Sequence, residues 1–169
     1  MEISKEILGE VVTELITTIG KACEQTPLPG PAFVIAEPGP NGKFGITLSP
    51  IEVDFTPERR KWARDTVTRW MDIDPDVVAV GILADAWVTH YDKHGVGLPR
   101  RDALTLSMWD KEKTVGAHIP YDKADDGKWK MRFDELSVAG VKDEEAVTGR
   151  LTADGKEVPW PHEELEELN

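Results

Sequence analysis

The chain has 169 residues, of which 40% are hydrophobic and 31% are charged, a composition typical of one globular domain and unlike that of a disordered segment. Its formal net charge of −12 argues against nucleic acid as a partner, because phosphate binding requires a cationic surface. The single cysteine, Cys23, excludes an intrachain disulfide.

The sequence predicts neither export nor membrane insertion. The N-terminal residues mix acidic and basic side chains with apolar ones, unlike a signal peptide. The longest run of apolar and glycine residues, 77–84, is much shorter than the ~20 residues that span a bilayer. We therefore expect a cytoplasmic protein without membrane contact.

The first 50 residues predict a helix followed by a hairpin. Apolar residues recur at spacings of three and four between residues 4 and 24, with Ser4 as the N-cap. The apolar arc is wider than a surface helix needs, so we expect this helix to be buried on more than one side. The hairpin has strands at 33–37 and 43–49, and Asn41-Gly42 supplies its turn.

A second helix is predicted from Thr56-Pro57-Glu58, an N-cap sequence, to about Met71. Its buried side is expected to carry Trp62, Ala63, Thr66, Val67, Trp70 and Met71, and its outer side the bases Arg60, Lys61, Arg64 and Arg69. We interpret the basic side as a solvated surface; docking of an acidic tail is the next reading, and nucleic acid the third.

Residues 77–133 predict four consecutive strands with alternating apolar positions. The apolar sets are Val78, Val80, Ile82, Ala84, Ala86 and Val88; Leu104, Leu106 and Met108; Val115, Ala117 and Ile119; and Trp129, Met131 and Phe133. Clean alternation is typical of an antiparallel meander with one buried face. The first strand is long, so a bulge near Gly81 is expected.

These elements predict an α+β fold. An antiparallel sheet of five or six strands, a hairpin plus a four-strand meander, would carry both helices on one face. Residues 1–137 would form this domain. Residues 138–169 would be an acidic extension that packs on it or trails from it, with a small hairpin at Asp154-Gly155.

The opposite sheet face is the first candidate site. If the even positions of the first central strand are buried, the odd ones and their partners present Asp85, Trp87, Thr89, Thr105, Ser107 and Trp109. Tryptophan among hydroxyl and charged groups is typical of a recognition surface. The alternative is that the C-terminal segment covers the two tryptophans.

The loop after the first central strand holds two weaker candidates. His90, Asp92 and His94 have a spacing that suits zinc or another divalent metal, with His118 or Asp85 as a further ligand. Lys93, Arg100 and Arg101 follow in a glycine-containing loop that could hold an anion or other ligand. Neither signal is specific, and no cofactor is expected.

The leading functional hypothesis is a soluble, non-enzymatic binding or accessory protein that uses the aromatic face for a protein partner or for self-association. One alternative is a metal-dependent hydrolase built on His90, Asp92 and His94. Another is an inhibitor whose acidic end imitates nucleic acid. Enzymatic activity is not favoured, because no nucleophile motif or nucleotide-binding loop is present.

Overall fold

The computed structural model describes residues 2–54, 56–88, 94, 96–97, 99–141, 149–151 and 157–159, and for residues 57, 139–141, 149–151 and 157–159 it describes the backbone alone. Their elements, in chain order, are α1 (Lys5–Gln25), β1 (Ala32–Pro38), the 3₁₀ turn η1 (Pro40–Gly42), β2 (Phe44–Pro50), α2 (Pro57–Ile73), β3 (Ala79–Val88), β4 (Arg101–Trp109), β5 (Thr114–Lys123), β6 (Trp129–Met131), η2 (Phe133–Glu135), β7 (Ser137–Val141), β8 (Gly149–Leu151) and β9 (Glu157–Pro159).

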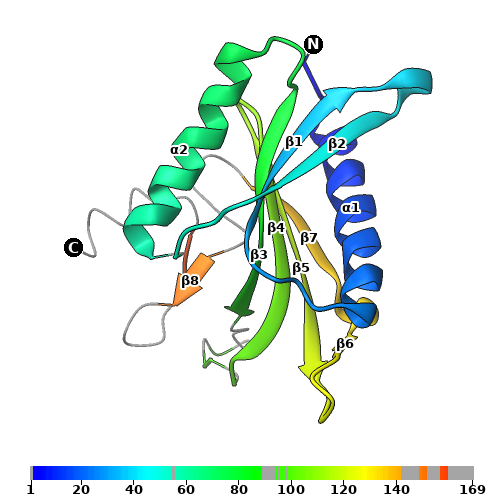
Figure 1. The fold of residues 1–169 in the computed structure, drawn as a ribbon, viewed down its shortest axis with the longest axis vertical. Coiled ribbons are helices and arrows are strands. Elements are labelled where there is room, and N and C mark those ends of the chain that lie inside the picture. The colour runs from blue at the N-terminus through cyan, green and yellow to red at the C-terminus, as the bar shows by residue number, and fades with distance from the viewer. Residues whose placement is uncertain are drawn as a thin grey trace.

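The predicted α+β class and the antiparallel sheet are confirmed (Figure 1). Within the described residues the strand order is β2-β1-β3-β4-β5-β6, and β7 pairs with β5 as a seventh strand. Both helices begin at the predicted caps: the Ser4 hydroxyl accepts a hydrogen bond from the Ile7 amide at 3.2 Å, and the Thr56 hydroxyl accepts one from the Arg59 amide at 3.4 Å. Neither helix of the described part is long and apolar enough to cross a membrane.

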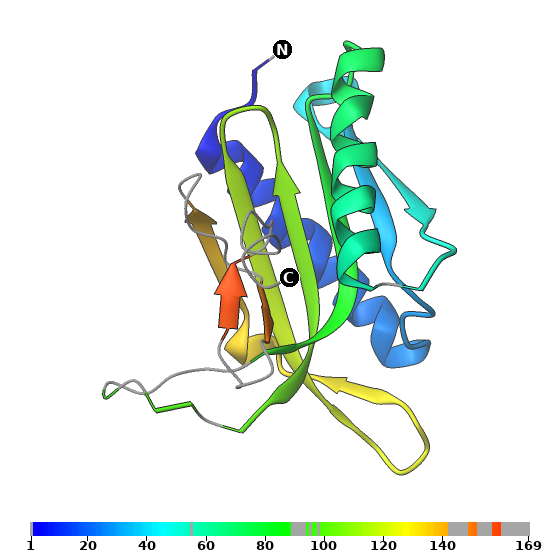
Figure 2. The same ribbon diagram turned by 90° about the vertical axis from the view of Figure 1, so that its left-hand side faces the viewer.

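The two helices cover opposite faces of the sheet, which corrects the expectation that they share one (Figures 1 and 2). Neighbouring residues of β1 show this, because Val34 packs in the α1 core and Ile35 in the α2 core. The cause lies in β3, where every residue from Ala79 to Leu83 is buried. A continuous apolar run needs cover on both faces, as in strands at the centre of a layered fold.

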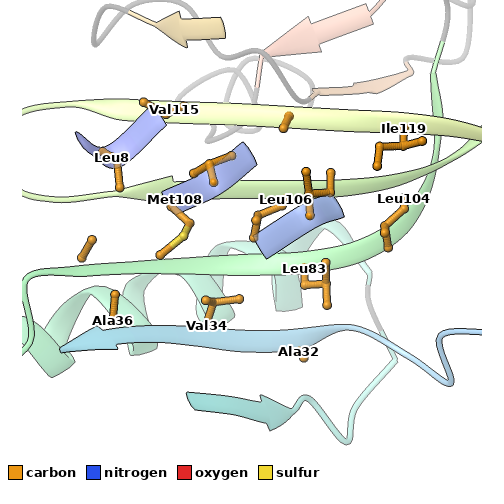
Figure 3. Packing of buried hydrophobic residues seen from close by; sticks show 14 of the residues in the cluster. Leu8, Ala32, Val34, Ala36, Leu83, Leu104, Leu106, Met108, Val115 and Ile119 are labelled. Carbon is orange, nitrogen blue, oxygen red and sulfur yellow. The ribbon is translucent and has the colours of Figure 1, made fainter. Parts of the chain in front are cut away.

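The larger core lies between α1 and the sheet. Figure 3 shows Leu8 of α1 beside Val115 of β5, together with buried side chains of β1, β3, β4 and β5 from the same core and with α2 behind the strands. Leu8, Val12 and Ile16 of the helix are fully buried. Their partners on the strands include Val34, Leu83, Leu104, Leu106, Met108, Ala117 and Ile119.

The second helix is rotated about its axis relative to the prediction. Ala63, Val67 and Met71 are buried, as expected, but Trp62 and Trp70 are 51% and 42% exposed. The predicted outer residue Arg64 instead turns toward the sheet, where its guanidinium carbon lies 4.1 Å from the centre of the Trp109 ring. A cation held over indole is favourable, so α2 places its arginine inward and its tryptophans outward.

No bulge interrupts β3 at Gly81. The β3–β4 register is continuous from Val80↔Trp109 to Val88↔Arg101. Glycine is needed there for another reason: an added Cβ would lie 2.4 Å from the Ser107 carbonyl oxygen. The strands approach too closely at this point for any side chain.

Beyond β7 the described residues form the small β8–β9 sheet, with Arg150 opposite Val158. This agrees with a hairpin in the C-terminal segment, although its predicted turn, Asp154-Gly155, lies outside the described residues. β8 lies close to β3, on the same side of the main sheet as α2 (Figures 1 and 2). The division of the chain at residue 137 stays a prediction.

Candidate functional site

The register of β3 and β4 divides the predicted binding face between the two sides of the sheet. Asp85 pairs with Leu104, and Trp87 with Asp102, so both lie on the side that α1 covers further along the strands. Thr105 pairs with Ala84 and therefore faces the α2 side. The expectation of one face was wrong because even-numbered residues of β3 pair with odd-numbered residues of β4.

On the α2 side, the predicted residues are interior. Trp109 is 2% exposed, and its indole nitrogen donates to the Thr68 hydroxyl of α2 at 2.9 Å. Thr105 and Ser107 are buried, and the Thr105 hydroxyl donates to the Ala84 carbonyl oxygen at 3.0 Å. His118, a candidate metal ligand, is opposite Thr105 on β5 and is buried too. Trp109 thus joins α2 to the sheet, and all four side chains are too buried to offer a surface to a partner.

On the α1 side, Trp87 remains 60% exposed. Its indole nitrogen donates to Asp102 Oδ1 at 3.1 Å, and the Arg100 guanidinium lies 5.5 Å from the ring centre. Lys123 Nζ lies 3.9 Å from the other oxygen of Asp102. We call Trp87, Arg100, Asp102 and Lys123 the Trp87 site.

Asp85 and Tyr121 form a hydrogen-bonded pair on the same face. The Tyr121 hydroxyl donates to Asp85 Oδ1 at 2.6 Å, and the Tyr121 ring stacks on Trp129 with centroids 3.9 Å apart. Burial raises the pKa of Asp85 above its ordinary value, and the Tyr121 hydrogen bond partly opposes that rise. Burial and the neighbouring carboxylate also raise the pKa of Tyr121, so the phenol stays protonated and remains the donor.

Replacing Asp85 by asparagine is expected to change how stability depends on pH. An aspartate whose pKa is raised in the folded state stabilises the fold most below its ordinary pKa of 3.8, and this contribution is lost as the pH rises through the folded-state value. The free energy of unfolding of the wild type, relative to Asp85→Asn, should therefore fall with pH above about 4. Urea titrations of both proteins across this range measure the difference.

Tyr121→Phe provides the control for that assignment. Removing the phenol removes the hydrogen bond that favours the ionised carboxylate and so raises the folded-state pKa of Asp85 further. The pH range over which Asp85 loses its contribution to stability should therefore extend to higher pH. If the wild type and Asp85→Asn keep a constant difference in stability across the range, the folded-state pKa of Asp85 is not raised.

The loop candidates are only partly described. Thr89, His90, Asp92 and Lys93 lie outside the described residues, and His94 is exposed. In the described part of the chain no three histidine, cysteine or acidic side chains are grouped to hold a metal ion. The metal hypothesis stays a prediction.

The predicted arginine pair of the loop is divided. Arg101 is the first residue of β4, and its guanidinium forms an ion pair with Glu135 at 2.6 Å. This contact raises the pKa of Arg101 and lowers that of Glu135. Arg100 contacts Trp87 instead. The two side chains therefore do not converge on one anion site.

Sequence reasoning missed a second exposed surface, on α2. Trp62, Trp70 and Ile73 are all exposed, Ile73 to 78%, and their spacing of eight and three residues places them along one side of the helix. Arg59 and Arg69 are exposed at similar helical positions. We call these five residues the α2 stripe. The amphipathic pattern indicated the helix, but not which side of it meets the sheet.

Comparison with family models, with curated proteins and with solved structures found no match.

Proposed function

We propose that the chain is a non-enzymatic binding protein that engages a protein partner through the Trp87 site. The observation that carries this proposal is the state of the Trp87 ring, which is 60% exposed and yet held by a hydrogen bond to Asp102. Large exposed aromatic side chains with polar neighbours are typical anchors of protein interfaces.

The ring is pre-organised for binding. Asp102 contacts both the indole nitrogen, at 3.1 Å, and Lys123, at 3.9 Å. Arg100 lies 5.5 Å from the ring centre. An aromatic side chain that is already fixed loses little conformational freedom when a partner covers it, and this favours affinity.

The form of the site favours a protein over a small molecule. Trp87 is near the end of β3, and more than half of its surface is accessible. Small-molecule sites are concave and enclose most of the ligand, whereas tryptophan and arginine on an open surface are the residue types that dominate binding energy between proteins. Arg100 and Lys123 add positive charge, which suits a partner with acidic groups around an apolar centre.

Truncation of the anchor tests the proposal. Wild-type protein would be immobilised and exposed to a cell extract, and a protein that it retains would be purified without reference to any variant. Its dissociation constant should rise about 30- to 1000-fold with Trp87→Ala, the range expected for an interface hot spot. Isothermal titration calorimetry measures the change.

Two variants control for other causes. Asp102→Ala should weaken binding less than Trp87→Ala, because it leaves the ring in place but removes its hydrogen bond. Trp62→Ala removes an equally large exposed indole from the α2 stripe and should leave affinity unchanged. Binding that is lost with Trp62→Ala but kept with Trp87→Ala would refute the Trp87 site and place the interface on α2.

A further inference from the structure

The strand β2 is an open edge of the main sheet. It is the outermost strand in the order β2-β1-β3-β4-β5-β6, and within the described residues it pairs with β1 alone. Figure 3 shows it at the outside of the sheet, with no strand beyond it. An edge strand presents unpaired backbone donors and acceptors, which are a template for pairing with another chain.

The unpaired groups of β2 belong to its even-numbered residues. The Ile51 amide donates to the Pro31 carbonyl oxygen at 2.9 Å, so position 51 faces β1. Inward and outward bonding alternate along an antiparallel strand. Phe44, Ile46 and Leu48 therefore direct their amides and carbonyls away from β1, and Pro50, which lacks an amide hydrogen, also falls on the outward side.

Most edge strands are protected against pairing, and β2 is not. Edges are usually short, charged or bulged. The strand β6 follows that rule, with three residues and Lys130 at its centre. In contrast, β2 has seven residues, FGITLSP, none of them charged, in unbroken register with β1. Only Pro50, at its end, blocks pairing.

The even-numbered side chains of β2 are also apolar. Ile46 pairs with Ala36 and Leu48 with Val34, which places both on the face of the α1 core. Phe44 and Ile46 are half-buried against that core, while Leu48 is 44% exposed. A strand added beside β2 would cover the exposed part of this apolar surface.

We propose that two copies of the chain associate by antiparallel pairing of β2 with β2 about a two-fold axis at Ile46. In this register Ile46 faces Ile46 of the second copy, and Phe44 faces Leu48 of the second copy. The outward amides and carbonyls of Phe44, Ile46 and Leu48 all find partners. A register shifted by one residue in each copy would place Phe44 opposite Pro50 and lose an amide donor there.

The uncharged and self-complementary sequence of β2 argues for a second copy as the occupant. Two molecules of net charge −12 repel each other over most of their surfaces, and an uncharged strand is a place where they can approach. An isologous contact must be self-complementary, and a two-fold pairing of uncharged, apolar residues meets that condition. Because the remaining charges still repel, the dimer should become tighter as salt is added.

Sedimentation equilibrium of the full-length chain tests the dimer. The wild type should show a monomer–dimer equilibrium that shifts toward dimer with salt. Leu48→Lys, which places a charge on the edge, and Leu48→Pro, which removes an outward amide without breaking a bond to β1, should each weaken association by tenfold or more, about 1.4 kcal/mol. Val138→Lys places the same charge on the exposed Val138 of β7 and should leave the dimer intact.

A cysteine variant tests the register. In Ile46→Cys, made with Cys23→Ala, the two new thiols would meet on the axis. The Cα atoms of hydrogen-bonded antiparallel pairs are about 5.5 Å apart, within the range of disulfides. Oxidation should give a covalent dimer, and Ser49→Cys, away from the axis, should give much less. A wild type that is monomeric at every concentration and salt would overturn the proposal, as would a dimer that Val138→Lys disrupts and Leu48→Lys does not. Neither outcome bears on the Trp87 site.

Discussion

Trp109→Ala is expected to lower the free energy of unfolding by about 3–5 kcal/mol, the range for removing a buried aromatic side chain. The indole is 2% exposed and belongs to the smaller core, between α2 and the sheet. It also donates to Thr68 at 2.9 Å and lies under the Arg64 guanidinium, 4.1 Å from its centre. Its loss therefore leaves a cavity and removes two polar contacts that hold α2. Chemical denaturation of the purified variant measures the change.

Amide hydrogen exchange, measured residue by residue, distinguishes a loosened α2 from a general loss of stability. Because Trp109 contacts Thr68 and Arg64, both on α2, the amides of that helix should exchange faster in Trp109→Ala than those of α1. Trp109→Phe keeps a ring and should cost less, and Thr68→Val leaves the buried indole donor unpaired and should cost about 1–3 kcal/mol. The exposed Trp87 is the matched control, since Trp87→Ala creates no buried cavity. Equal losses at the two tryptophans would contradict the structural role of Trp109.

The class of the fold could be predicted from local patterns, because they report the period of each element. The caps at Ser4 and Thr56 and the presence of the central antiparallel strands depend on neighbours in the chain, and these predictions are confirmed. The placement of the helices depends on which residues of β3 need cover. The run from Ala79 to Leu83 is apolar at every position, and that continuity, rather than the alternation, indicated two covered faces.

The candidate site was predicted only in part, because its composition depends on strand register. Alternation says which residues of one strand share a face, but not which face of the neighbouring strand they join. A difference of one residue between β3 and β4 separates Trp87 from Trp109. Tyr121 follows Val115, Ala117 and Ile119 at the same two-residue spacing in β5, so its burial could have been predicted. Its hydrogen bond to Asp85, 36 positions away, could not, since nothing local encodes that pairing.

The same limit explains why the prediction that Trp62 and Trp70 of α2 are buried was wrong. Trp62 and Trp70 have the largest apolar side chains of α2. Burying them is therefore the simplest assumption for an amphipathic helix. Smaller side chains meet the sheet instead: Ala63 and Val67 are fully buried, which lets the helix approach closely. The partner that decides this is Trp109 of β4, which occupies the space beneath α2 and stacks with Arg64. One large residue on the sheet thus excludes two on the helix.

The close approach of β3 and β4 at Gly81 predicts a large loss of stability when this glycine is replaced. Gly81→Ala should lower the free energy of unfolding by about 1–3 kcal/mol, and Gly81→Val by more, because added atoms in a packed interior force neighbours to move. The new Cβ would lie 2.4 Å from the Ser107 carbonyl oxygen and 2.7 Å from Met108 Cγ. The methionine side chain can shift, but the backbone oxygen belongs to the β3–β4 ladder and can move only if the strands separate.

Gly9→Ala adds the same methyl group as Gly81→Ala but should have the opposite effect on the free energy of unfolding. Gly9 lies within α1, and an added Cβ there has no atom within 4 Å. Alanine is the better helix former, so this variant should gain about 0.5–1 kcal/mol. Thermal and urea unfolding of the two variants against the wild type measure the pair of changes. A stable Gly81→Ala would mean that β3 and β4 lie further apart than the structure places them, and a bulge would then again be the better account of glycine in this strand.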